Sequence, residues 1–168
     1  DLNILNDVKK EDFLKKLDPV YETVKETKKK LSISNKDTIG FVGAPWTLLL
    51  YMLNRKSPKE GNFTVFPKDK YINNILMKLD KFLKIHIEAQ IESGASIIQI
   101  FDSWAGLLPE KDLDYFVYKP IKSLVDFIRQ KKTISICFPR NINSYKKFVD
   151  NVNPDIISID YNVDPSII

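Results

Sequence analysis

Cysteine is almost absent from this sequence, since Cys137 is the single one among 168 residues. A lone cysteine excludes a disulfide within the chain, and the shortage is typical of intracellular proteins. The sequence also has no apolar run of about 18 residues, the length that a transmembrane helix needs. Its first residues, 1–3, carry neither the positive charge nor the apolar segment of a secretory signal. We therefore expect a cytoplasmic protein that does not bind a membrane.

Histidine is equally scarce, because His86 is the only one. It lies between Ile85 and Ile87 in a stretch of helical periodicity, and we interpret it as a packing residue. Without it, no Ser–His or Cys–His nucleophile pair can form in this chain. Cys137 lies in an apolar run and is interpreted as inert core. Zinc in a catalytic site needs three protein ligands, so with one cysteine and a remote histidine we expect no metal site in this chain.

Glycine-rich nucleotide motifs are also missing. Neither Gly-x-Gly-x-x-Gly nor Gly-x-x-x-x-Gly-Lys occurs, so the sequence does not support a dinucleotide site or a P-loop. Internal repeats are not apparent either.

Positive charge is in small excess, with 26 Lys and Arg against 22 Asp and Glu and a net charge of +4. A basic balance can indicate a nucleic-acid partner. Most lysines, however, alternate with acids, as in Lys9–Asp12. The densest run, Lys28–Lys30, falls where a helix is expected to end, and the helix dipole favours cations there. We interpret the lysines as solvated helix faces and expect no nucleic-acid partner.

Long amphipathic stretches alternate with short apolar runs along the chain. Strands are expected at 38–44, 97–101, 133–138 and 156–160, and helices at about 45–53, 68–93, 113–129 and 144–152. Two more helices are expected to meet at Asp18-Pro19, and the third helix of the series to bend or break near Pro120. Residues 54–66 are expected to form a loop.

Nearly continuous apolar strands that alternate with helices indicate a parallel sheet, buried on both faces. The fold class is therefore α/β. A complete (β/α)8 TIM barrel needs about 250 residues, so about four parallel βα units indicate part of such a barrel. We expect residues 1–168 to be a partial barrel domain that lacks N- and C-terminal barrel segments. Because half a barrel leaves two unpaired strand edges and an uncovered inner face, this piece is expected to depend on missing sequence, self-association or a rearrangement.

Polar and aromatic residues recur where the strands are expected to end, which is where α/β barrels build their sites. Phe41 and Phe101 either fill a barrel interior or line a pocket, and Trp46 is interpreted as packing. Asp102 is either a general base or a helix cap. Arg140 is either a clamp for a carboxylate or a solvated side chain.

The order of these segments resembles one family. The stretch Ile39–Leu48 followed by Tyr51-Met52 is similar to the "GFxGxPWTLxxYM" segment of the uroporphyrinogen decarboxylases. The segment Gln99–Gly106 resembles that family's "F(D/E)(S/T)xxG". Phe138–Arg140 and Ile159–Tyr161 fall where the family has its next two strand ends, and the resemblance covers essentially the whole chain.

The resemblance implies a cofactor-free carboxy-lyase that converts uroporphyrinogen III to coproporphyrinogen III by removing four acetate carboxyl groups. It implies an anionic tetrapyrrole substrate and a homodimer for the full-length protein. Tyr51 and Ser103 match substrate-contacting residues of the family, and Phe41 matches a phenylalanine that lines the pocket.

The departures from the family pattern concern the catalytic groups. The family's arginine segment, its central aspartate and its asparagine–glycine–histidine–glycine element have no counterpart here, so the chain is expected to contain no catalytic residue and to be inactive alone. After Phe138–Arg140 the family usually has glycine, whereas this chain has Asn141.

Two alternatives remain open. A corrinoid-dependent methyltransferase of the same superfamily binds zinc through a His-x-Cys pair, but Ser135 stands where that histidine belongs, two residues before Cys137. A non-catalytic barrel fragment, kept as a binding or assembly piece, is the other.

Overall fold

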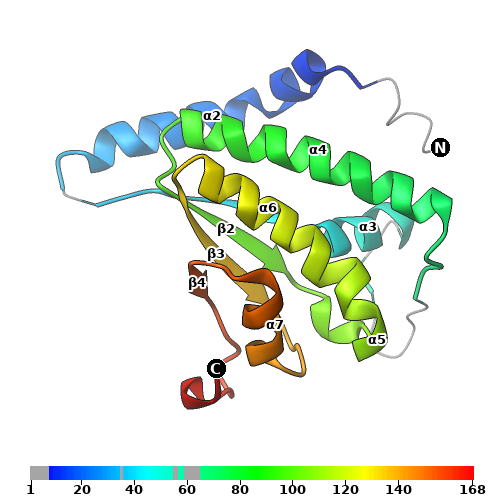
Figure 1. Cartoon of the computed structure of the whole chain (residues 1–168). Coiled ribbons are helices and arrows are strands. Elements are labelled where there is room, and N and C mark those ends of the chain that lie inside the picture. Colours follow the sequence, from blue (N-terminus) through cyan, green and yellow to red (C-terminus); the bar gives the residue numbers. More distant parts are fainter. Residues whose placement is uncertain (1–7, 35, 55–56, 59–64) are drawn as a thin grey trace.

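The computed structural model describes residues 8–34, 36–54, 57–58 and 65–168 (Figure 1). Its helices are α2 (Lys10–Leu31), α3 (Pro45–Asn54), α4 (Lys70–Glu92), α5 (Glu110–Leu113), α6 (Lys119–Gln130) and α7 (Tyr145–Val152), with short helical turns η1 (Ala105–Leu107), η2 (Asp114–Tyr118) and η3 (Pro165–Ile167). Its strands are β1 (Ile39–Gly43), β2 (Ile97–Asp102), β3 (Ile134–Pro139) and β4 (Ile156–Ile157). Strands and helices alternate along the chain, as the sequence predicts. The predicted loop at 54–66 lies largely outside the described residues.

The four strands form one parallel sheet in the order β1-β2-β3-β4, which confirms the predicted α/β class. Gly43 is paired with Phe101, and Phe101 with Phe138, so the ends of the first three strands lie level with one another. Each crossover runs through at least one helix, as parallel strands require.

The fourth strand is shorter than the predicted 156–160. Ser158 still donates its backbone N–H to the carbonyl of Cys137 at 2.8 Å. The chain then leaves β3, because the N–H of Asp160 donates to the Tyr145 hydroxyl, at 3.2 Å, and not to the neighbouring strand.

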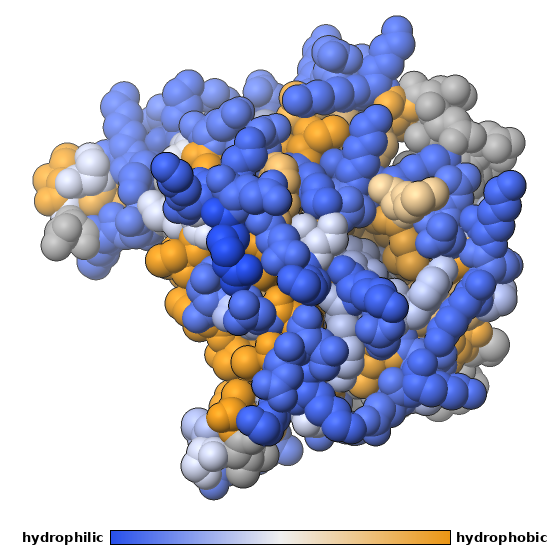
Figure 2. All heavy atoms as spheres, viewed as in Figure 1, coloured by the Kyte–Doolittle hydropathy of each residue, from blue (hydrophilic) through white to orange (hydrophobic). Residues whose placement is uncertain are grey.

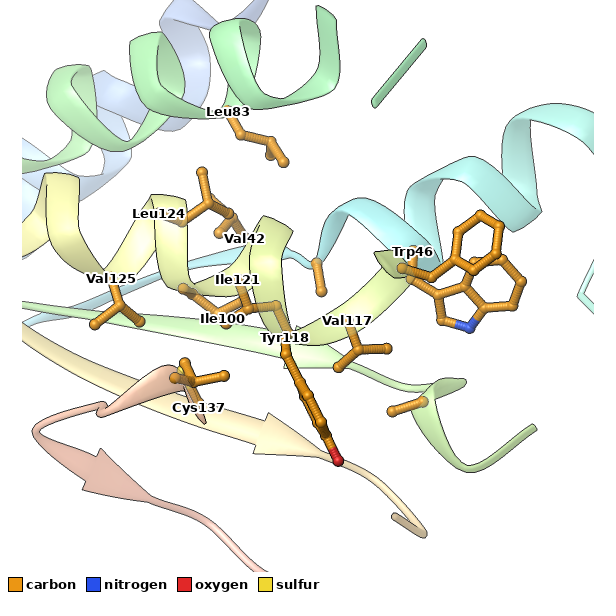
Figure 3. Packing of buried hydrophobic residues seen from close by; sticks show 14 of the residues in the cluster. Val42, Trp46, Leu83, Ile100, Val117, Tyr118, Ile121, Leu124, Val125 and Cys137 are labelled. Carbon is orange, nitrogen blue, oxygen red and sulfur yellow. The ribbon is translucent and has the colours of Figure 1, made fainter. Parts of the chain in front are cut away.

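One face of the sheet is covered by α3, α4 and α6, and Figure 1 shows α4 and α6 running along its upper side. Val42, Ile100 and Cys137 point from the sheet into this layer and meet Leu124 and Val125 of α6 (Figure 3). Every one of these five side chains is at most 2% exposed. This single layer is the hydrophobic core of the chain.

The opposite face of the sheet is open. Alternate residues of the strands point to it, and large apolar side chains remain exposed there: Ile39 (49%), Phe41 (64%), Ile134 (44%) and Ile156 (45%). Figure 2 shows hydrophobic atoms gathered along the flank between α2 and the C-terminal segment, beside the mostly hydrophilic helix surface. The general expectation of a sheet buried on both faces is therefore wrong for the described part of this chain, because helices cover only one face. The uncovered inner face that half a barrel is expected to leave is confirmed there.

Helix α2 runs through Pro19 as one helix, so the prediction of two helices meeting at Asp18-Pro19 is wrong. Proline removes one hydrogen bond from a helix, but the carbonyl it leaves belongs to the exposed Lys15 and can be solvated. Packing of α2 along α4 holds the helix together across this point, with Phe13 against Phe82 at a ring separation of 4.9 Å.

Two other helix predictions are confirmed. Helix α4 begins at the N-cap Asp69, whose carboxylate accepts the N–H of Ile72 at 2.8 Å, and it is followed by Gly94 at φ 109°. The irregularity expected near Pro120 is the π-helical turn η2, which ends two residues earlier at Tyr118. A wider turn accommodates the missing N–H and the bulky ring of proline. None of the helices in the described ranges is long and apolar enough to cross a membrane.

Candidate active site at the carboxyl ends of the strands

Three hydrogen bonds hold the strand ends together. The N–H of Ala44, which follows β1, donates to the carbonyl of Phe101 at 2.8 Å. The N–H of Arg140, which follows β3, donates to the carbonyl of Asp102 at 3.0 Å. The N–H of Gly106 donates to the carbonyl of Arg140 at 3.1 Å. The segments singled out from the sequence therefore lie side by side at one edge of the sheet.

A row of phenylalanines crosses the open face near these ends. Phe101 of β2 lies between Phe41 of β1 and Phe138 of β3, with ring centroids 6.0 Å and 6.4 Å apart. Both contacts are edge-to-face, an arrangement that the charge distribution of aromatic rings favours. The row presents an apolar, aromatic surface on the side of the sheet where a closed barrel has its interior.

Three side chains of helix α3 form hydrogen bonds to the end of β2 and to the loop that follows it (Ser103-Trp104). Thr47 donates its hydroxyl to the Asp102 carboxylate at 2.7 Å. Trp46 donates its indole N–H to the carbonyl of Trp104 at 3.0 Å. Trp104 in turn donates its indole N–H to the hydroxyl of Tyr51 at 3.1 Å. Thr47 and Tyr51 are four residues apart and thus share one helix face.

Asp102 lies at the end of β2 and is 0% exposed. Burial raises the pKa of its carboxyl to about 7, and the hydrogen bonds from Thr47 and from the backbone of Trp104 offset only part of this effect. One carboxyl oxygen, Oδ2, has no hydrogen-bond partner among the described residues. Asp102 does not cap the helical turn that follows it, because η1 has no side-chain cap hydrogen bond. Its carboxyl instead joins α3 to the loop after β2, and its role as a general base stays a prediction.

The three predicted substrate-binding residues lie around this edge. Tyr51 is 39% exposed and its hydroxyl is held by the loop after β2. Ser103 is half-buried in that loop, directly after Asp102. Phe41 is 64% exposed at one end of the phenylalanine row. The fold thus assembles residues from β1, α3 and the loop after β2, and their roles in binding stay predictions.

The turn after β3 forms with asparagine in place of the family's glycine. Asn141 adopts φ 57°, the left-handed conformation that glycine and asparagine tolerate best. Its N–H donates to Asp160 at 2.6 Å, and the Tyr145 hydroxyl donates to the same carboxylate oxygen at 2.6 Å. Arg140, beside it, is exposed. Its two interpretations, a clamp for a carboxylate and a solvated side chain, both stay predictions.

Two interpretations from the sequence are confirmed by packing. Trp46 is 0% exposed and lies 4.9 Å, between ring centroids, from Phe116. Cys137 is 0% exposed and points toward α6, on the helix-covered face (Figure 3), and burial raises the pKa of its thiol. A zinc ion inside a barrel needs its ligand on the other face, so this cysteine does not fit the methyltransferase alternative.

His86 packs between α2 and β1, where its Nδ1 lies 3.0 Å from the Tyr21 hydroxyl. The described residues bring together no three His, Cys, Asp or Glu side chains that could hold a metal ion. Among the described residues, the strand ends therefore carry hydroxyls, aromatic rings, the buried carboxyl of Asp102 and the charged side chains of Arg140 and Asp160.

Sequence reasoning did not find the contacts of Thr47, Trp104 and Asp160. Thr47 and Tyr51 stand four residues apart just after a strand, which is a signal that one helix face turns to the next loop. The contacts of Trp104 and Asp160 join separate elements, and nothing in local spacing indicates them.

Four parallel strands in chain order, covered by helices on one face and ending in a row of aromatic and hydroxyl side chains, are the arrangement of part of an α/β barrel. Comparison with known proteins narrows the class. The sequence model described as uroporphyrinogen decarboxylase (URO-D) matches residues 1–167. The chain belongs to the uroporphyrinogen decarboxylase family, and its sheet supplies about half of that family's TIM barrel.

Curated relatives agree with this assignment. The chain is 42% identical to a uroporphyrinogen decarboxylase of Rickettsia bellii over 153 residues, which are 86% of this chain and 44% of the relative. It is 38% identical to that of Orientia tsutsugamushi strain Ikeda, over 88% of this chain and 45% of the relative. It is 34% identical to that of Campylobacter fetus, over 96% and 48%. The chain therefore spans slightly less than half the length of these relatives.

Proposed function

We propose that this chain is part of a uroporphyrinogen decarboxylase, which converts uroporphyrinogen III to coproporphyrinogen III in porphyrin and heme biosynthesis. In this reaction each of four acetate side chains loses its carboxyl carbon as carbon dioxide and gains a proton at the remaining carbon, which becomes a methyl group. Membership of the family supports the assignment. The complete polypeptide would act in the cytoplasm, as a homodimer.

The observation that carries the proposal is the joining of Tyr51 to the loop of Ser103 beside the phenylalanine row. A tetrapyrrole is a broad, partly apolar molecule with carboxylates at its edge. An aromatic surface suits its rings, and hydroxyl donors beside that surface suit its carboxylates. Phe41, Tyr51 and Ser103 are the residues we assign to substrate binding.

The chain supplies a binding surface and no catalytic residue in this proposal. The family's central aspartate, to which we assign stabilisation of the developing positive charge of the pyrrole, has no counterpart in residues 1–168. Electrostatic stabilisation of that kind contributes a large share of catalysis, so the chain alone is expected to be inactive.

The test compares carbon dioxide release and coproporphyrinogen formation by the 168-residue chain and by the complete polypeptide. Activity in the longer protein alone supports the proposal. Inactivity of both, when both are folded, refutes it and favours a non-catalytic barrel fragment. Tyr51→Phe in the active protein is expected to lower kcat/KM, whereas Tyr71→Phe, at an exposed position of α4, serves as the matched control and is expected to leave it unchanged.

A further inference from the structure

In the hydrogen bond between Trp104 and Tyr51, the donor and the acceptor are fixed by chemistry. An indole N–H can only donate, so the Tyr51 oxygen is the acceptor in the 3.1 Å hydrogen bond. A phenol hydroxyl lies near the ring plane and has two positions there, one on each side of the oxygen. The indole N–H takes the lone pair on one side, and the phenol proton is therefore left on the other.

The backbone around Trp104 is itself held in place by two hydrogen bonds from α3. The carbonyl of Trp104 accepts the indole N–H of Trp46, which is 0% exposed. Two residues earlier, the buried Asp102 accepts the hydroxyl of Thr47. Both donors come from the first turns of α3, the same helix that carries Tyr51. The donor and the acceptor of the Trp104–Tyr51 bond are thus fixed to one rigid element.

We infer that Trp104 is a positioning residue: its indole N–H holds the Tyr51 oxygen so that the phenol proton points away from the protein, toward a carboxylate of the bound substrate. The inference rests on the proposed function for the identity of that substrate. Its chemistry is general, since a phenol whose oxygen already accepts a hydrogen bond is a stronger and better directed donor to an anion.

Kinetics of the complete polypeptide provide the first test. Trp104→Phe keeps a ring but removes the donor, and we expect kcat/KM to fall about tenfold, the factor that one lost hydrogen bond explains. Trp104→His is the rescue variant, because its Nε2 lies as many bonds from Cβ as the indole nitrogen does, and most of the activity is expected to return. In a Tyr51→Phe background, Trp104→Phe is expected to cause no further loss, because its target hydroxyl is gone.

A purely structural role gives different results. Trp104→Phe would then lower kcat/KM by the same factor with or without the Tyr51 hydroxyl, and Trp104→His would not restore it. Either result overturns the inference. Thermal unfolding of each variant shows whether the loss follows stability or follows the missing donor.

The bond itself is tested without catalysis. The chain has two tryptophans, so a ¹⁵N-labelled sample gives two indole N–H resonances, assigned with Trp104→Phe. Tyr51→Phe is expected to shift the Trp104 resonance and to speed its hydrogen exchange about tenfold. An unchanged Trp104 indole overturns the inference even if the complete polypeptide is active. An inactive wild type refutes the proposed function, and the indole spectra still decide whether Trp104 holds Tyr51.

Discussion

The side-chain amide of Gln90 pairs with the backbone of Phe41 as a neighbouring strand would. Its Oε1 accepts the N–H of Phe41 at 3.0 Å, and its Nε2 donates to the carbonyl of Phe41 at 3.1 Å. Thr38 and Ala44 bond toward β2, so by alternation Phe41 faces the outer edge of the sheet. Gln90, on α4 and 2% exposed, therefore provides hydrogen-bond partners for the backbone N–H and carbonyl at the centre of the outer edge of β1.

Removing this amide is expected to destabilise the protein. Gln90→Ala leaves one donor and one acceptor of Phe41 unpaired in a partly buried place, which costs about 2 kcal/mol of unfolding free energy. Urea unfolding measures the loss. Gln130→Ala, at an exposed position ending α6, is the matched control and is expected to change stability by less than about 0.5 kcal/mol. Equal effects of the two substitutions would contradict the edge role.

Gly106 is expected to tolerate no side chain. A Cβ at this position would lie 2.3 Å from the backbone oxygen of Asn141, so the loops after β2 and β3 would have to separate. Gly106→Ala is expected to cost about 1–3 kcal/mol, as overpacking does. At Gly43, in contrast, the added Cβ would meet only the side chain of Leu48, at 3.1 Å, which can give way. Thermal unfolding should show the larger drop for Gly106→Ala, and a larger drop for Gly43→Ala would refute this account.

Asp102 makes stability depend on pH. Burial raises the pKa of this carboxyl from 3.8 to about 7. Between these values the folded protein keeps a proton that the unfolded chain has released, so the unfolding free energy falls as pH rises through this range and is level above it. The fall amounts to roughly 4 kcal/mol at most.

Asp102→Asn removes this titration while keeping an acceptor for Thr47. The variant is expected to gain stability relative to the wild type as pH rises from about 5 to 8. Urea unfolding at several pH values measures the difference between the two proteins, in which all other titrating groups cancel. A difference that does not change with pH would show that the carboxyl is already ionised in the folded state.

His86 gives the unfolding free energy a pH dependence of the opposite sign. Burial lowers its pKa below the ordinary 6.5, because the charged imidazolium is poorly solvated. The unfolded chain therefore takes up a proton first as pH falls, and the contribution of His86 to stability is fully present above about 6.5 and lost below it.

Because His86 is the only histidine, its imidazole titration can be followed directly by NMR. The midpoint is expected below 6.5 in the wild type and in Tyr21→Phe, which keeps the covering ring. Tyr21→Ala admits water and is expected to return the midpoint toward 6.5. A midpoint unaffected by Tyr21→Ala would show that Tyr21 does not supply the burial.

The open sheet face is expected to make the isolated chain self-associate. Exposed apolar side chains gathered on an uncovered sheet face favour association in water. Ile134→Lys combined with Ile156→Lys, both on this face, should reduce association in sedimentation experiments. Met77→Lys, on the solvent side of α4, is the control and should not. A wild-type chain that stays monomeric over a wide concentration range would contradict the expectation.

Much of the fold was predictable because its elements are marked locally. The strands are apolar runs, α4 has a cap at each end, and α7 begins at Ser144, which caps Lys147. Pro19 misled the prediction because proline acts on local hydrogen bonds, whereas packing against α4 decides whether the helix continues. The length of β4 was also not predictable, because the Asp160–Tyr145 bond that ends its pairing joins separate segments.

In the candidate site, too, the residues were predictable from local motifs, whereas the contacts between segments were not. Phe41, Tyr51 and Ser103 were singled out by their order and by the motifs around them, and the structure places all three near the strand ends. The direction of the Tyr51 hydroxyl and the burial of Asp102 were not predicted. Both depend on how α3 lies across the loop after β2.

The sequence by itself determined the alternation of strands and helices, the parallel α/β class and the family, because these depend on residue type and order along the chain. Only the tertiary structure decided which face of the sheet is covered, which edge groups Gln90 satisfies and which residue holds Tyr51. The physical reason is that burial and hydrogen bonding are properties of surfaces brought together from distant segments. Spacing in the sequence carries information about neighbours within one element, and far less about the neighbours that another element supplies.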